Sequence, residues 1–86
     1  MSHRVEIRPA ARRFLKKLRD DDLLRRITAA LRELESNPRP VGSEKMAGPD
    51  DLHRIRIGDY RVVYQIHDQV LLVLIIRIGN RREVYR

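Results

Sequence analysis

The pattern of hydrophobic and polar positions predicts a short strand followed by two helices. Alternation over residues 3–8 predicts the strand, with Val5 and Ile7 on one face. Pro9 suits the first turn of a helix. The apolar residues that follow recur with helical spacing, at Ala11, Phe14, Leu15 and Leu18. The outer side of this helix is basic and carries Arg12, Arg13, Lys16 and Lys17.

The second helix is predicted to begin after the three aspartates at 20–22, which supply an N-terminal cap and favourable negative charge. Its apolar positions are Leu23, Leu24, Ile27, Leu31 and Leu34. It ends near the Ser36-Asn37-Pro38 stretch. Because few residues separate the helices, we expect an antiparallel helical hairpin. Residues 37–51, rich in proline and glycine, are expected to form a loop.

The segment HRIRIGDYRVVYQI, residues 53–66, alternates on both sides of Gly58-Asp59 and predicts a β-hairpin with a two-residue turn. One face is apolar and should form core: Ile55, Ile57, Tyr60, Val62 and Tyr64. The other face carries Arg54, Arg56, Arg61 and Val63. This register sets Arg56 directly opposite Arg61, and opposed like charges destabilise a sheet. The arginine cluster therefore indicates an anionic ligand.

The run VLLVLIIRI, residues 70–78, is apolar on both faces and predicts a central buried strand after a tight turn at Asp68-Gln69. A turn at Gly79-Asn80 and a short strand over residues 83–85 should follow. Continuing the hairpin register places apolar side chains beside the arginines, at Leu72, Leu74 and Ile76. An apolar patch rimmed by charge predicts a protein partner.

This order of elements predicts an α+β fold: an N-terminal strand, a helical hairpin and an antiparallel β-meander, with the helices packed on one face of the sheet. We expect a single domain over residues 1–86, since a chain of this length supports one modest core. The net charge is +7, from 19 Lys and Arg against 12 Asp and Glu. Such a balance favours a nucleic acid or an acidic protein as partner.

The absence of cysteine excludes disulfides, thiolate metal sites and a cysteine nucleophile. The three histidines show no metal-ligand spacing, and we expect no metal site. The first residues lack the apolar core of a signal peptide, and the longest apolar run is too short to span a bilayer. We therefore expect a soluble, cytoplasmic protein that does not bind membranes.

Three stretches, NPRPVGSEKMAG, RIRIGDYRVVYQI and the ending IGNRREVY, carry a resemblance that runs over nearly the whole chain. The sequence resembles the RelE/ParE superfamily of bacterial and archaeal toxins from type II toxin–antitoxin modules. The RelE-like resemblance implies an endoribonuclease that needs neither metal nor cofactor and cuts mRNA in the ribosomal A site. It also implies three partners: a cognate RelB-like antitoxin, the ribosome with its mRNA, and operator DNA bound only through the antitoxin complex.

The resemblance assigns candidate site residues by position. Arg54 and Arg56 stand at the two basic positions of the first hairpin strand, and Arg61 stands in a Gly-x-Tyr-Arg motif. Arg81 follows the apolar strand, and Tyr85 is the C-terminal tyrosine. We expect four catalytic residues: Arg56, Arg61, Arg81 and Tyr85. The expected RNA-binding residues are Arg54, Lys45, Arg12, Arg13, Lys16 and Lys17.

The chemistry of RNA cleavage suits these residue types. Attack by a ribose 2′-OH on the adjacent phosphate builds negative charge on phosphoryl oxygens, which Arg61 and Arg81 would stabilise through two-point hydrogen bonds. The resemblance suggests that Arg81 gives a proton to the leaving 5′-oxygen and that Tyr85 orients a base. Some relatives carry lysine at the hairpin positions. The free arginine side chain is effectively never deprotonated at neutral pH and cannot accept a proton, so a conventional general base is missing here.

Two alternatives remain open. A ParE-like toxin that poisons DNA gyrase would share the fold without needing the arginine cluster, and a non-catalytic basic module would only bind RNA or a protein. Several candidate residues also have simple structural interpretations. The basic residues of the first helix could simply form a solvated face. Lys45 could be a turn residue, and Tyr85 could pack near an edge strand.

Overall fold

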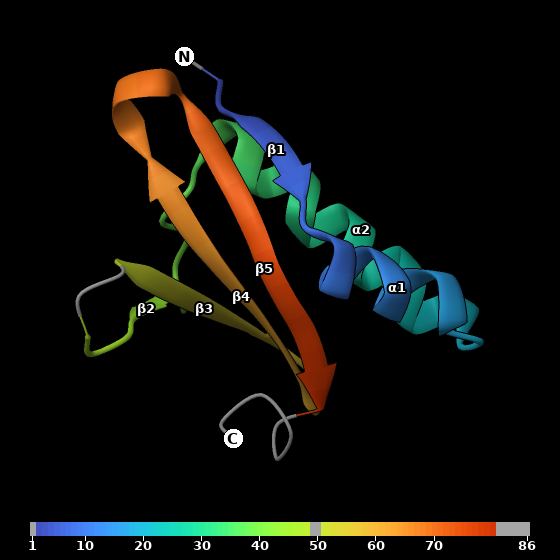
Figure 1. Cartoon of the computed structure of the whole chain (residues 1–86). Helices are drawn as coiled ribbons and strands as arrows, with labels where there is room; N and C mark the ends of the chain where they lie inside the picture. Colours follow the sequence, from blue (N-terminus) through green and yellow to red (C-terminus); the bar gives the residue numbers. More distant parts are fainter. Residues whose placement is uncertain (1, 49–50, 81–86) are drawn as a thin grey trace.

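The computed structural model describes residues 2–48 and 51–80 (Figure 1). In chain order the elements are β1 (Arg4–Ile7), α1 (Pro9–Lys17), α2 (Asp21–Ser36), β2 (Glu44–Lys45), β3 (Leu52–Ile57), β4 (Tyr60–His67), the 3₁₀ helix η1 (Asp68–Val70) and β5 (Leu72–Asn80). The five strands form one mixed sheet in the order β1-β5-β4-β3-β2. Strand β1 runs parallel to β5, and the other neighbouring strands are antiparallel.

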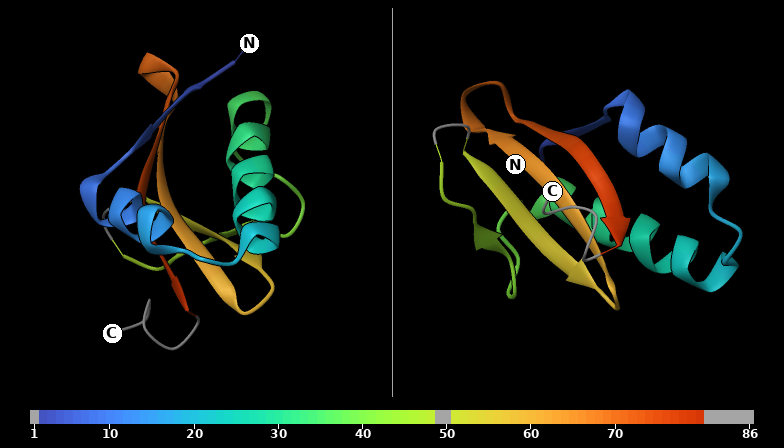
Figure 2. Two further views of the ribbon diagram at one scale, coloured as in Figure 1. Left: turned by 90° about the vertical axis from the view of Figure 1, so that its right-hand side faces the viewer. Right: turned by 60° about the horizontal axis from the view of Figure 1, so that its bottom comes forward.

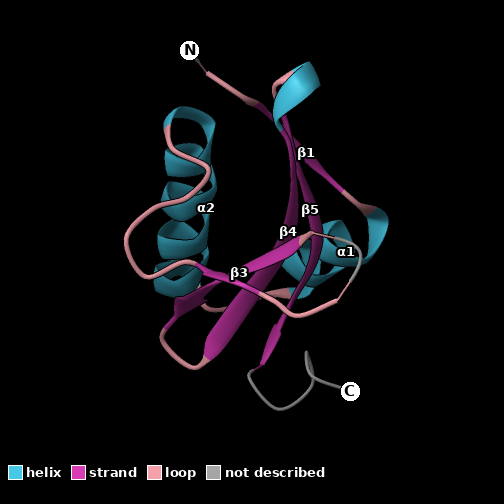
Figure 3. Ribbon diagram, turned by 90° about the vertical axis from the view of Figure 1, so that its left-hand side faces the viewer, coloured by secondary structure: helices cyan, strands magenta, loops and turns pink. Residues whose placement is uncertain are grey.

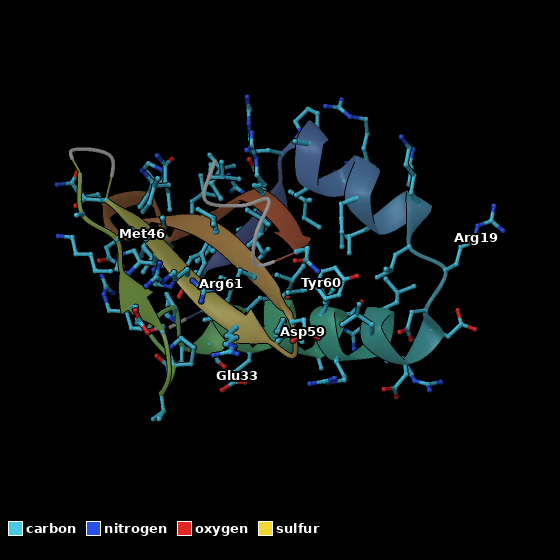
Figure 4. The ribbon with its side chains drawn as sticks, turned by 90° about the horizontal axis from the view of Figure 1, so that it is seen from below. Arg19, Glu33, Met46, Asp59, Tyr60 and Arg61 are labelled. Atoms are coloured by element: carbon cyan, nitrogen blue, oxygen red, sulfur yellow. The ribbon has the colours of Figure 1, made fainter. Side chains whose placement is uncertain are left out.

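Both helices lie to one side of the strands (Figure 2, right), which confirms the predicted α+β fold. Helix α1 begins at Pro9, and α2 begins after Asp20, whose carboxylate accepts a hydrogen bond from the backbone N–H of Leu23 at 3.0 Å. Helix α2 then runs back along the sheet (Figure 4). Among the described helices, none is long and apolar enough to cross a bilayer.

The core lies between the helices and the inner face of the sheet. The helices contribute Ala11, Leu23, Ile27, Leu31 and Leu34. The sheet contributes Ile55, Ile57, Val62, Tyr64, Val73, Ile75 and Ile78. Tyr64 is fully buried, and its hydroxyl donates a hydrogen bond to the Pro38 carbonyl at 2.8 Å, which ties the segment after α2 to the sheet. The predicted core face of the hairpin is confirmed, with Tyr60 partly buried at its margin.

Strand β5 differs from its prediction at both ends. The predicted two-residue turn at Asp68-Gln69 is wrong, because η1 and a left-handed Leu71 (φ 51°) make a longer connection. The predicted turn at Gly79-Asn80 is also wrong, since both residues continue β5 opposite Arg61 and Tyr60. Strand β4 begins directly after the hairpin turn, so its backbone offers hydrogen bonds along the full length of β5. The strand predicted over residues 83–85 lies outside the described residues.

Two further differences concern pairing. The expected loop over residues 37–51 contains β2, a two-residue strand that pairs with the start of β3. The register of β4 and β5 shifts between Val63 and Tyr64, which oppose Arg77 and Ile75. This bulge returns Ile78 to the core, where it is 4% exposed. Leu72 and Leu74 lie on the arginine-bearing face, as predicted, and are partly exposed. Ile76, which was predicted beside them, has no partner on β4, because the bulge falls at this residue.

Candidate functional site

Three arginines meet on the face of the sheet that points away from the helices. Arg54 and Arg56 come from β3 and Arg61 from β4, and together with Gly42, Glu44 and Ile55 they line a small pocket of about 50 Å³. We call it the arginine pocket. Arg56 and Arg61 are direct cross-strand neighbours, as the hairpin register predicts. Figure 3 shows β3 and β4 side by side, with α2 flanking the sheet.

Glu44 holds Arg54 in this pocket. The two residues are register partners on β2 and β3, and Arg54 Nη2 lies 2.7 Å from Glu44 Oε2. The hydrogen bond from Arg54, the charge of Arg54 and the charge of Arg61 lower the pKa of Glu44. The carboxylate is therefore ionised at neutral pH. With three guanidinium groups and one carboxylate, the pocket carries a net charge of +2, which suits an anionic ligand.

Arg56 and Arg61 differ in their surroundings although they are neighbours. The Nε and Nη1 atoms of Arg61 are shielded from solvent, and Figure 4 shows this side chain beside the strands. Arg56 is exposed, and its Nε donates a long hydrogen bond of 3.4 Å to the Gly58 carbonyl. A guanidinium that is already enclosed loses little freedom when an anion binds. Arg61 is thus more restrained than Arg56 before any ligand binds.

The structure does not bring Lys45 into the arginine pocket. Lys45 opposes His53 in the β2–β3 ladder, one position on from the Glu44–Arg54 pair, so its side chain points to the other face. Its Nζ atom lies 3.2 Å from Asp51 Oδ1. Lys45 therefore lies in β2 and not in the turn that its simple structural interpretation predicted, and its predicted contact with RNA stays a prediction.

The four basic residues of α1 that were predicted to bind RNA separate into two pairs. Arg13 and Lys17 line a groove between α1 and β5, together with Arg77. Arg12 and Lys16 are exposed and do not line it. The two remaining predicted catalytic residues, Arg81 and Tyr85, lie outside the described residues.

Sequence reasoning missed two residues of these surfaces, Glu44 and Arg77. Glu44 reaches the arginine pocket only because β2 pairs with β3, and a strand of two residues leaves no recognisable pattern in the sequence. Arg77 did leave a signal. It is the one charged residue in the apolar run 70–78, a position that burial alone does not explain.

The histidines have structural environments. His53 is buried and stacks on Tyr64 with ring centroids 5.7 Å apart. Burial, and then the positive charges of Arg39 and Lys45, lower the pKa of His53, so the ring is neutral at pH 7. His3 pairs with Asp68 at 3.0 Å. Within residues 2–48 and 51–80, no group of three or more His, Cys, Asp or Glu side chains is arranged to hold a metal ion.

Comparison with known proteins places this geometry in a family. The family model for the ParE toxin of the type II toxin–antitoxin system parDE matches residues 5–85. Toxin RelG of Mycobacterium tuberculosis is 33% identical over 89 aligned residues, which cover 100% of this chain and 99% of the relative. The archaeal RelE–RelB complex from Pyrococcus horikoshii OT3 contains a chain with 30% identity and a TM-score of 0.83, covering 96% of this chain and 99% of that one.

A second solved relative gives the same result. In the intact RelBE toxin–antitoxin complex of E. coli, one chain is 25% identical with a TM-score of 0.79, covering 92% of this chain and 96% of that one. Family model, sequence relatives and solved structures agree over almost the full length. The chain therefore belongs to the RelE/ParE superfamily of toxins from type II toxin–antitoxin modules.

Proposed function

We propose that this toxin is a ribosome-dependent mRNA endoribonuclease that inhibits translation. One observation carries the proposal: Arg54, Arg56 and Arg61 converge on one small pocket, although placing Arg56 opposite Arg61 costs stability. The pocket is open on the sheet face and large enough for the oxygens of one phosphate group rather than for a whole nucleotide. A phosphodiester with its neighbouring sugars outside the pocket fits these dimensions.

The cleavage step is a transfer within the RNA strand. The ribose 2′-oxygen forms a bond to the adjacent phosphorus while the bond from phosphorus to the 5′-oxygen breaks, which leaves a 2′,3′-cyclic phosphate and a 5′-hydroxyl. Negative charge rises on the phosphoryl oxygens during this step. Arg61 binds these oxygens from its enclosed position, and Arg56 binds them from the opposite strand.

Glu44 supplies the proton acceptor that the sequence-based mechanism lacked. Its carboxylate lines the pocket and is ionised, so it takes the proton that leaves the 2′-hydroxyl. The lowered pKa makes it a weak base but keeps it in the acceptor form over the neutral range. By resemblance, Arg81 gives a proton to the leaving 5′-oxygen and regains one from water, Glu44 releases the 2′-hydroxyl proton to water, and Tyr85 orients a base. No metal or cofactor takes part in this scheme.

The proposed partners follow from the relatives. The P. horikoshii and E. coli structures are RelE–RelB and RelBE complexes, so we propose that a RelB-like antitoxin neutralises this toxin. A charge of +7 favours both an acidic protein segment and RNA. The toxin acts in the cytoplasm, where it meets ribosomes and mRNA. It contacts operator DNA only through the antitoxin complex, and residues 1–86 act as a single domain.

The test is a reconstituted translation reaction in which mRNA 5′ ends are mapped by primer extension, with ribosomes present or omitted. We expect cuts within the A-site codon that require ribosomes and are lost in Arg61→Ala. Arg19→Ala is the matched control, because this arginine points away from the molecule beyond α1 (Figure 4). Uncut mRNA at concentrations that stop growth would refute the nuclease.

Inhibition of DNA gyrase is the second candidate function, since the matching family model is that of the ParE toxin. A supercoiling assay with purified gyrase separates the two. A gyrase inhibitor would block supercoiling, and Arg61→Ala would leave its toxicity unchanged. For the nuclease we expect unimpaired supercoiling and a non-toxic Arg61→Ala variant.

A further inference from the structure

A second concave surface lies between α1 and β5, two elements that pack against each other. It has a volume of about 350 Å³. Arg13 and Lys17 line it from the helix, Arg77 and Gly79 line it from the strand, and the ring of Phe14 forms an apolar wall. We call it the cationic groove.

The groove is purely cationic in the part of the chain that the structure describes. None of its lining residues is acidic. Arg13, Lys17 and Arg77 form no ion pair with any carboxylate of the described ranges. Arg13 and Lys17 are one helical turn apart, so their Cβ atoms are about 5–6 Å from each other. Three cations facing one groove without acidic partners repel one another, and an anion with several charges relieves this repulsion.

The groove adjoins the arginine pocket. Gly79 lines the groove and is also the cross-strand neighbour of Arg61, which lines the pocket. Such neighbours have Cα atoms about 4.5–5.5 Å apart. One extended polyanion can therefore contact both.

We infer that the cationic groove binds backbone phosphates of the same RNA strand that enters the arginine pocket, at nucleotides beside the cut. This inference rests on the proposed nuclease function. Guanidinium groups match phosphate geometry with two hydrogen bonds, and the repeating charge of an RNA backbone suits a row of cations. Arg77, Arg13 and Lys17 then all bind backbone phosphates of the substrate RNA. Arg12 and Lys16, which lie outside the groove, do not take part.

Binding of 2′-O-methyl oligoribonucleotides, which cannot be cleaved, tests the inference. One oligonucleotide of about three nucleotides fills only the pocket, and one of about 12 nucleotides reaches the groove as well. The variants are Arg77→Gln and the double variant Arg13→Gln/Lys17→Gln. The matched controls, Arg19→Gln and Arg19→Gln/Arg32→Gln, remove the same charge from exposed positions outside the groove. Thermal unfolding confirms that every variant folds.

We expect the groove variants to bind the longer oligonucleotide roughly three- to tenfold more weakly per cation lost, and the short one unchanged. The slope of log K against log salt should fall by about 0.7 for each lost phosphate contact. The control variants should bind both oligonucleotides like the wild type. Equal losses in groove and control variants would overturn the inference, and so would a wild type that does not bind the longer oligonucleotide.

Two further outcomes assign the groove to another ligand and also overturn the inference. Weaker binding to ribosomes with unchanged oligonucleotide binding would assign it to ribosomal RNA. Weaker binding to polyglutamate alone would assign it to an acidic protein. Cleavage by the wild type in the translation reaction is scored separately. If the wild type does not cleave mRNA but the groove variants still bind the longer oligonucleotide more weakly, the nuclease function is refuted. If the wild type cleaves and the groove variants bind the longer oligonucleotide as tightly as the wild type, RNA binding by the groove is refuted.

Discussion

Replacing Arg61 with lysine separates charge from geometry at the arginine pocket. The substitution keeps one positive charge but loses the planar fork that binds two phosphoryl oxygens at once. The guanidinium is partly enclosed, since its Nε and Nη1 atoms are shielded from solvent. One hydrogen bond to a charged group contributes about 1.5–3 kcal/mol. We therefore expect the rate of the cleavage step to fall by roughly 10- to 100-fold, since about 1.4 kcal/mol corresponds to a factor of ten.

The assay is single-turnover cleavage of mRNA on programmed ribosomes with excess toxin, so that the rate reports the chemical step rather than product release. Arg61→Ala removes the charge as well and should cost about 3 kcal/mol or more. Arg19→Lys is the control for an arginine-to-lysine change and should cleave like the wild type. A lysine variant within about twofold of the wild-type rate would refute two-point binding by Arg61.

Three other predictions concern stability, each measured by denaturant or thermal unfolding. Tyr64→Phe removes the donor to a backbone carbonyl in a fully buried site and should destabilise the fold by about 1–2 kcal/mol, and an unchanged unfolding midpoint would contradict this. Asp20→Ala removes the cap of α2 and should cost about 0.5–2 kcal/mol, whereas Asp20→Asn should cost much less. Hydrogen bonds from Arg39 and then His3 lower the pKa of Asp68. Because the folded pKa lies below the unfolded one, this stabilisation is present above pH of about 4 and disappears as pH falls further. Asp68→Asn should be less stable than the wild type at pH 7 and lose less stability in acid, and parallel pH profiles would contradict the assignment.

The β-hairpin was predictable because two independent signals agree there. The alternation of residues 53–66 specifies which side chains face the core, and the Gly58-Asp59 turn specifies which residues are neighbours. A slip by one position would expose every apolar side chain. The opposition of Arg56 and Arg61 therefore followed from the sequence alone. The helical hairpin was equally clear, because caps and apolar spacing agree at α2.

The structure differs from the prediction where hydrophobic and polar residues do not alternate along the sequence. Residues 70–78 are apolar on both faces, so a register shift inside this strand changes no hydrophobic pattern. The bulge opposite Val63 and Tyr64 was for that reason undetectable. Gly79-Asn80 has the composition of a turn, but the adjacent strand β4 supplies backbone hydrogen bonds that favour an extended conformation. Strand pairing with β4 therefore overrides the local preference of Gly79-Asn80 for a turn.

The candidate site also combines residues that the sequence could predict with residues that it could not. The three arginines of the pocket were recognisable from strand alternation, whereas the carboxylate beside them comes from β2. The groove likewise combines a helix and a strand that are distant in sequence. Its contact with the arginine pocket depends on the pairing of Gly79 with Arg61. Relationships of this kind exist only in the folded chain.

The chemical identity of the cut ends shows whether the ribose 2′-hydroxyl attacks the adjacent phosphate. Ribosomes carrying a defined mRNA are incubated with the toxin, and the fragments are analysed by mass spectrometry. A second mRNA carries a single 2′-deoxynucleotide at the cut position. Attack by the 2′-hydroxyl should leave a 2′,3′-cyclic phosphate on the upstream fragment and a 5′-hydroxyl on the downstream fragment, with no cut in the deoxy-substituted mRNA. A 5′-phosphate, or undiminished cutting of the substituted mRNA, would contradict attack by the 2′-hydroxyl within the arginine pocket.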